Sequence, residues 1–330
     1  MKSGLFLYGI IGASDIPVSE EIEIGNPAAP VVFTVRFQEI AAVVSPHALI
    51  AYDTVEKEQI VKDLAIHQLV IEKVMERFTI IPVKFGTIVE SKDEISNVLE
   101  KGYALLRDML EKRKEKIELD VVAWWELPEI LPILTQQNSQ LQEKQQEIIQ
   151  KGDEASVEDK ISLGQCIQQA LSAEKVSYQQ TILQTLKQAA EDVCMHSQAD
   201  DQIIFNAGFL LEKKNEASFH HVVDTLDQNL QSRIHFRVVG PLPTYSFSTI
   251  QIKKLDPRCV EEAKKTLDLP TEFTAKMVHD AYHKHAKEHH PDKTNGEDTQ
   301  EFQRIHSAYT TLKDFVDNGL IYPEVYQYAQ

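Results

Sequence analysis

Short apolar runs and longer helical patterns alternate along the first part of the chain. Runs of β-branched residues bounded by Gly, Pro or Ser predict strands, and they lie at residues 5–11, 31–37, 40–45, 80–89 and 117–125. Between them, apolar residues recur every three or four positions over 54–78 and 95–110, which predicts helices. This order is typical of an α+β layer, with helices packed on one face of a mainly antiparallel sheet.

The middle of the chain has a different pattern. Residues 128–198 are rich in Gln, Glu, Lys and Ala with Leu and Ile at helical spacing, which predicts two or three helices. Strand patterns return at 202–211 and 234–240, on either side of a helical pattern at 218–230. This strand, helix, strand order predicts a second ferredoxin-like layer. Beyond residue 260 the pattern is purely helical, which predicts a third, small module.

The expected fold class is therefore α+β, with two ferredoxin-like domains, a helical insertion and an all-α C-terminal part. We expect the N-terminal domain at residues 1–115, the second domain at 116–255 and the helical module at 256–330. A chain of 330 residues is long enough to give each of these parts a core.

Charge and cysteine content restrict the function further. The chain has 34 basic and 51 acidic residues, a formal charge of -17, which disfavours nucleic acid and anionic membranes as partners. The three cysteines are widely spaced, without a CxxC pair, which fits a reducing cytoplasm. The longest uncharged apolar stretch, 40–52, contains Pro46 and is shorter than the roughly 18 residues of a membrane span. We expect a cytoplasmic protein without membrane insertion.

Motifs of common enzymes are missing from the sequence. It contains no GxGxxG, no P-loop, no GxSxG and no HExxH. We therefore expect neither an enzyme nor a bound cofactor, although an enzyme built on ferredoxin-like domains remains the main alternative.

A histidine-rich segment at 283–298, HKHAKEHHPDKTNGED, is the candidate for metal chemistry. An EF-hand loop with Gly296 at its sixth position would begin at Pro291 and end at Phe302, so both end ligands are missing. The pairs His279/His283 and His285/His289 are each spaced for one helix face, but neither has a third zinc ligand placed with it. We expect surface histidines and no metal site.

Two apolar stripes surround this segment and predict an antiparallel helical hairpin. The first consists of Val278, Ala281, Tyr282 and Ala286, and the second of Phe302, Ile305, Ala308, Tyr309 and Leu312. The connection between the two helices contains His290, Pro291 and Asp292, which places an imidazole, a rigid turn and a carboxylate at the tip of the hairpin.

Residues 264–316 resemble a J domain, the co-chaperone module of the DnaJ family. The resemblance rests on LDL at 267–269, AYHKHAKEHHPDK at 281–293 and FQRIHSAYTTL at 302–312. It implies binding to a DnaK-type chaperone and stimulation of its ATP hydrolysis. The residues implied in DnaK binding are His290, Pro291 and Asp292, supported by Lys284 and Lys287 of the basic helix.

Two positions depart from the J-domain pattern. His285 stands where leucine is usual and His283 where arginine is usual. Over residues 274–290 the three lysines exceed the two acids by one, so protonation of histidine would strongly change the charge of this helix. A hairpin that no longer stimulates a chaperone is the alternative interpretation.

A second resemblance covers about residues 5–250 and points to the gas vesicle protein family GvpL/GvpF. It rests on five blocks in order: YGI at 8–10, AAVVS at 41–45, IIPVKFGT at 80–87, NAGFLLEK at 206–213 and GPLPTYSF at 240–247. From the residues alone these blocks are mostly structural. His67, on the apolar side of its helix, is predicted to be a hydrogen-bonded core histidine.

This resemblance implies an accessory protein of gas vesicle assembly that binds the hydrophobic shell protein GvpA and other Gvp proteins. The J-like module would bring an ATP-driven chaperone to an aggregation-prone client. The alternative is a minor structural component of the vesicle whose hairpin is only a docking element. The expected location is the cytoplasm, with association with the gas vesicle.

Overall fold

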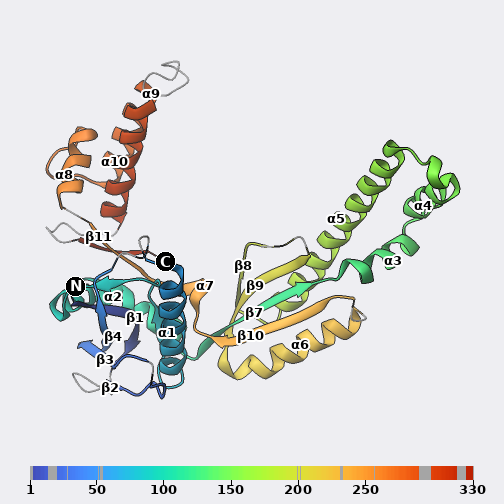
Figure 1. The fold of residues 1–330 in the computed structure, drawn as a ribbon. Helices are drawn as coiled ribbons and strands as arrows, with labels where there is room; N and C mark the ends of the chain where they lie inside the picture. Colours follow the sequence, from blue (N-terminus) through green and yellow to red (C-terminus); the bar gives the residue numbers. More distant parts are fainter. Residues whose placement is uncertain are drawn as a thin grey trace. The chain divides into compact units, whose positions relative to one another are not determined.

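The computed structural model divides into two compact units, residues 1–112 with 248–330 and residues 113–247. Its description covers residues 3–13, 21–27, 29–50, 52, 55–198, 200, 202–230, 233–255, 257–289, 299–317 and 325–329. Figure 1 shows an N-terminal sheet with its helices, a second sheet with helices of its own and a C-terminal helical module.

The first sheet is antiparallel, with the order β2-β3-β4-β1-β5 and with β6 also paired to β1. Its strands are β1 (Ser3–Gly12), β2 (Glu21–Ile22), β3 (Val32–Phe37), β4 (Ile40–Ala48), β5 (Ile80–Pro82) and β6 (Ile88–Val89). The predicted strand at 80–89 is therefore wrong as a continuous element. The chain turns between β5 and β6, where Gly86 has a φ of 84°, a conformation that favours glycine.

The helices α1 (Lys57–Met75) and α2 (Lys92–Arg113) pack on opposite faces of this sheet, not on one face as expected. The rings of Phe6 and Tyr8 contact His67 of α1, whereas Leu7 shares a core with Ile95 and other residues of α2. Successive strand residues point to opposite faces, so both faces of β1 are buried.

The second sheet is also antiparallel and has the order β10-β7-β9-β8. Its strands are β7 (Lys116–Trp124), β8 (Asp192–Met195), β9 (Ile203–Glu212) and β10 (His235–Leu242). The α+β class with antiparallel sheets is thus confirmed. After residue 247 the chain belongs to the first unit again, where Ile250 forms a parallel β-bridge with Val83. Ile250 N donates to Pro82 O, and Lys84 N donates to Ile250 O, both at 2.8 Å.

The helices of the second unit are α3 (Leu127–Gln137), α4 (Ser139–Lys151), α5 (Val157–Lys187) and α6 (Glu216–Asn229). The short α7 (Tyr245–Ser248) follows β10. Residues 128–198 contain three helices, as predicted, but they also contain β8. The helical prediction is wrong there because β8 pairs with β9, for example Val193 with Phe209, and this long-range pairing outweighs the local preference.

The C-terminal module contains α8 (Pro257–Thr266), α9 (Ala275–Glu288) and α10 (Thr299–Asp317). Its core is separate from the others and consists of Val260, Ala263, Leu267, Val278, Ile305, Ala308 and Leu312. The predicted hairpin is confirmed as α9 and α10, and the ring of Tyr282 stacks on that of Tyr309 at 4.2 Å. The part beyond residue 260 is not purely helical, because β12 (Val325–Ala329) pairs with β11 (Gln251–Leu255).

Candidate functional site

Helix α9 carries the described part of the predicted binding surface. Its first turn is capped by the Thr274 side chain, which accepts a hydrogen bond from Met277 N at 3.3 Å. Val278 is buried in the module core, while Lys284 and Lys287 are exposed. The two lysines are therefore accessible to a partner.

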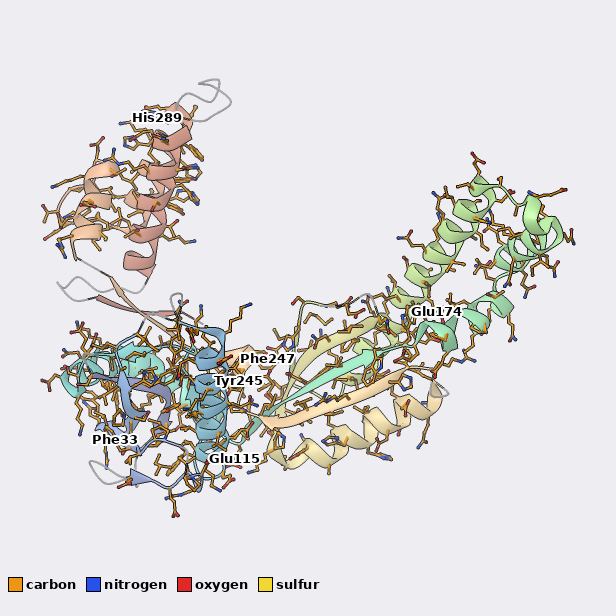
Figure 2. The ribbon with its side chains drawn as sticks, viewed as in Figure 1. Phe33, Glu115, Glu174, Tyr245, Phe247 and His289 are labelled. Carbon is orange, nitrogen blue, oxygen red and sulfur yellow. The ribbon has the colours of Figure 1, made fainter. Side chains whose placement is uncertain are left out.

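The tip residues His290, Pro291 and Asp292 lie outside the described residues, so their predicted role stays a prediction. The last described residue before them is His289, at the end of α9 (Figure 2). Along the described helix, Lys276, Lys284 and Lys287 exceed Asp280 and Glu288 by one charge, in a chain whose formal charge is -17.

Two groups of residues on α9 bring potential metal-ligand atoms close together. The Nε2 atoms of His279 and His283 lie 3.1 Å apart on exposed side chains. One ligand atom each from His285, Glu288 and His289 lie within 4.8 Å of one another, and His285 Nε2 is also 3.5 Å from Asp268 Oδ2. Glu288 is thus a third candidate ligand beside the His285/His289 pair, which was not expected from the sequence. These three residues lie along one side of a single helix, which gives an ion little enclosure.

The first unit has a cavity of about 230 Å³. Titratable side chains line it, among them His47, Lys62 and Asp63. The Asp63 carboxylate is already occupied, because it accepts hydrogen bonds of 2.8 Å from Tyr52 Oη and from Gln59 Nε2. His47 Nε2 lies 3.6 Å from the same carboxylate. Through these contacts Asp63 links α1 to neighbouring segments of the chain.

His67 is a core histidine, as predicted, but the prediction that it is hydrogen-bonded is wrong for Nδ1. That atom is buried and has no partner among the described residues. The rings of Phe6, Tyr8 and Phe85 pack against the imidazole, and the Tyr8 hydroxyl is paired with Ser45 Oγ at 2.8 Å instead. Burial lowers the pKa of His67 to about 4, so the ring is neutral near neutral pH.

A polar cluster in the second unit was not expected from the sequence. Glu118 is 1% exposed on β7, and it accepts hydrogen bonds from Ser246 Oγ at 2.5 Å and Ser246 N at 2.9 Å. His196 Nε2 lies 3.0 Å from the same hydroxyl. Burial raises the pKa of Glu118 to about 7, helped by the nearby charge of Asp120 and opposed by the hydrogen bonds from Ser246.

The residues of this cluster stand in predicted elements and motifs, but in separate segments of the sequence. Glu118 and Asp120 are two residues apart in a predicted strand, so they share a face of the sheet. Gly208 and Ser246 belong to the blocks NAGFLLEK and GPLPTYSF. Only the folded structure shows that these two blocks meet at the Glu118 carboxyl group.

Comparison with known proteins agrees with both resemblances. The family model for gas vesicle synthesis protein GvpL/GvpF matches residues 4–249, and the DnaJ domain model matches residues 265–317. Gas vesicle protein F of a Nostoc species is 25% identical over 256 residues, which cover 76% of this chain and 100% of that protein. Gas vesicle protein F1 of Halobacterium salinarum is 22% identical, with 76% of this chain and 96% of that protein covered.

Solved structures show the same fold. The crystal structure of the gas vesicle protein GvpF from Anabaena sp. matches with a TM-score of 0.62 and 25% identity, and covers 74% of this chain and 98% of that chain. The GvpF structure from Microcystis aeruginosa matches with a TM-score of 0.55 at 21% identity. Because the GvpL/GvpF model spans most of the sequence, the chain belongs to the gas vesicle synthesis protein GvpL/GvpF family, and it carries a DnaJ domain after the family region.

Proposed function

We propose that this protein is a non-catalytic accessory factor of gas vesicle assembly. In this proposal it works in the cytoplasm, where it binds the hydrophobic shell protein GvpA and other Gvp proteins. Its DnaJ domain recruits a DnaK-type chaperone to that client. Family membership supports the gas vesicle role, and the presence of two modules on one chain supports the chaperone link.

The observation that carries the chaperone link is the separate core of the C-terminal module. Leu267, Val278 and Leu312 are each no more than 1% exposed there. This core holds α9 against α10 and leaves Lys284 and Lys287 in solvent. A rigid helix with exposed lysines suits an acidic partner surface, because complementary charge guides association and orientation.

The physical need for a chaperone comes from the client. A shell protein with a large apolar surface aggregates if that surface meets other copies before assembly. A chaperone delivered on the same chain that binds the shell protein acts at high effective concentration. No chemical step on this chain is needed for that role.

The test is the ATPase rate of a cognate DnaK with the full chain, measured at low salt. Wild type should stimulate hydrolysis, and His290→Gln should remove the stimulation. Lys284→Glu with Lys287→Glu should reduce it severalfold, because the charge offered to the partner is reversed. The control is Lys276→Glu, which makes one such charge reversal, to be compared with each single variant, on an exposed residue at the other end of α9.

The client side is tested by co-expressing the shell protein with the wild-type chain or with His290→Gln. We expect soluble shell protein and vesicles with the wild type, and aggregated shell protein with the variant. Absence of ATPase stimulation by the intact chain would overturn the chaperone link. Retention of the protein in purified, washed vesicles would then favour the minor structural component whose hairpin is a docking element.

A further inference from the structure

One face of the second sheet carries an unusual set of side chains. On β7, Ile117, Leu119 and Val121 point into the core of this unit. Glu118 and Asp120 alternate with them and therefore point to the opposite face. The core face is covered by α6, which lies along the sheet in Figure 1, and by the C-terminal part of α5. The polar face is contacted by Ser246 of α7, between Tyr245 and Phe247 labelled in Figure 2.

Two segments distant in sequence supply metal-ligating groups to this face. Glu118 and Asp120 come from β7, and His196 follows β8 directly. One ligand atom from each lies within 4.8 Å of the other two. The histidine is held in place because its backbone N–H donates to Asn206 O at 2.9 Å, which continues the pairing of β8 with β9.

Gly208 provides the room for the two carboxyl groups. It lies on β9, paired with Asp120 on one side and with Cys194 on the other. A Cβ atom at this position would lie 2.8 Å from Glu118 Oε1 and 2.9 Å from Asp120 Oδ1. Both distances are shorter than side chains tolerate, so the absence of a side chain on β9 lets both carboxyl groups lie over the strand.

The two carboxyl groups are not equally satisfied. Both oxygens of Glu118 accept hydrogen bonds from Ser246. Asp120 Oδ1 is buried and has no hydrogen-bond partner among the described residues. An unpaired, buried carboxylate oxygen beside a second carboxyl group is costly, and either a bound cation or a proton shared by the two groups removes this cost.

We propose that Glu118, Asp120 and His196 bind one divalent cation of the Zn²⁺ or Mn²⁺ class. Two carboxylate oxygens and one imidazole nitrogen suit these borderline cations, whereas Ca²⁺ takes six to eight oxygens. Ser246 acts from outside the ligand set, because its two hydrogen bonds fix the Glu118 carboxylate.

Ion binding exchanges one hydrogen bond for a metal bond. The Ser246 hydroxyl proton is directed to Glu118, so the His196 Nε2–H is the donor to Ser246 Oγ. To bind a cation through Nε2, the imidazole carries its proton on Nδ1 instead. The bound ion then joins β7 to the segment after β8, which stabilises the edge of the sheet.

The test uses the full chain without a polyhistidine tag and with the competing imidazoles removed. His279, His283, His285 and His289 are replaced by Gln, since among the described residues the α9 groups are the other candidates for an ion. Calorimetric titration with Zn²⁺, and with Mn²⁺ followed by paramagnetic resonance, should show one equivalent bound. Asp120→Asn and His196→Gln should each weaken binding at least tenfold.

Matched controls come from the same unit. Asp224→Asn and His221→Gln make the same chemical changes at exposed residues of α6 and should bind like the parent. Folding is checked by fluorescence of Trp124 and Trp125, the two tryptophans of the chain, both in this unit. In the parent the ion should also raise the urea midpoint of this fluorescence transition, and in His196→Gln it should not.

Either of two results would overturn the proposal. Unchanged affinity in both Asp120→Asn and His196→Gln would place the ion elsewhere on the protein. No binding by the parent would mean that the two carboxyl groups share a proton and take no cation. If Asp120→Asn fails to fold, the decision rests on His196→Gln, whose side chain is only half-buried at the edge of the sheet.

Discussion

Ser246 donates two hydrogen bonds to Glu118, from its hydroxyl to Oε1 at 2.5 Å and from its backbone N–H to Oε2 at 2.9 Å. The two residues are 128 positions apart, and they join the first strand of the second unit to the segment that follows its last strand. Glu118 is 1% exposed, and its carboxyl group is thus held by Ser246, which lies near the end of the region that matches the GvpL/GvpF family model.

Replacement of Glu118 by Gln should change how the stability of the second unit depends on pH. The pKa of Glu118 is raised to about 7 in the folded protein, so the folded state keeps a proton that the unfolded chain has lost. Stability conferred by this proton is present below the unfolded pKa and is lost as pH rises to about 7. In a chelator, the stability of Glu118→Gln relative to wild type should therefore rise by on the order of 1 to 3 kcal/mol between about pH 5 and about pH 8.

The measurement is urea unfolding followed by tryptophan fluorescence, at about pH 5 and about pH 8. Glutamine keeps a carbonyl acceptor for Ser246, and Asp224→Asn is the control for loss of one surface charge. An equal loss of stability at both pH values in Glu118→Gln would contradict the prediction.

Replacement of Gly208 by Ala should destabilise the same unit by about 1–3 kcal/mol. The added Cβ would lie under 3.0 Å from the carboxyl oxygens of both Glu118 and Asp120. The control is Gly164→Ala in α5, where a Cβ meets nothing within 4 Å. That change should stabilise the helix by up to about 1 kcal/mol. Opposite signs in tryptophan-detected urea unfolding are expected, and equal effects would refute the steric argument.

Replacement of His67 by Phe should protect the N-terminal unit against mild acid. The pKa of His67 is lowered to about 4, so below its ordinary value of 6.5 the unfolded chain takes up a proton that the folded protein does not. Stability is complete above about pH 6.5 and falls as pH drops toward 4. At about pH 5 the variant should gain on the order of 1 to 2 kcal/mol, because Phe does not titrate.

Hydrogen exchange of β1 and β4 measures this effect, since the unit contains no tryptophan. The same variant at about pH 8 is its own control, because His67 is neutral in both states there. A gain of equal size at both pH values would assign the effect to packing and not to protonation.

Replacement of Leu312 by Ala should destabilise the DnaJ domain by about 2–5 kcal/mol. Leu312 is fully buried in the core of α8, α9 and α10. Met277→Ala is the control, because Met277 is 38% exposed on α9. Faster hydrogen exchange across α8 to α10 in the first variant alone, with the family region unchanged, is the expected result. Faster exchange in all regions would mean that the module does not hold a core of its own.

Local patterns were sufficient for most elements and failed where distant pairing decided the structure. The stripes through Val278 and Ile305 predicted the α9–α10 hairpin, because an apolar stripe on a helix needs a partner. The strand at 192–195 lies in a segment with helical composition, and it is a strand because β9 offers a free edge. The strand at 325–329 likewise exists through its pairing with β11.

The same division between local pattern and long-range pairing applies to the candidate sites. The sequence by itself determined the α+β class, the C-terminal hairpin and the family, because periodicity and ordered motifs are properties of neighbouring residues. Only the tertiary structure brought Glu118, Asp120, His196 and Ser246 together over Gly208. Each is an ordinary polar residue in its local sequence. The register of the sheet and the fold of the chain bring these residues together, although some are as many as 128 positions apart.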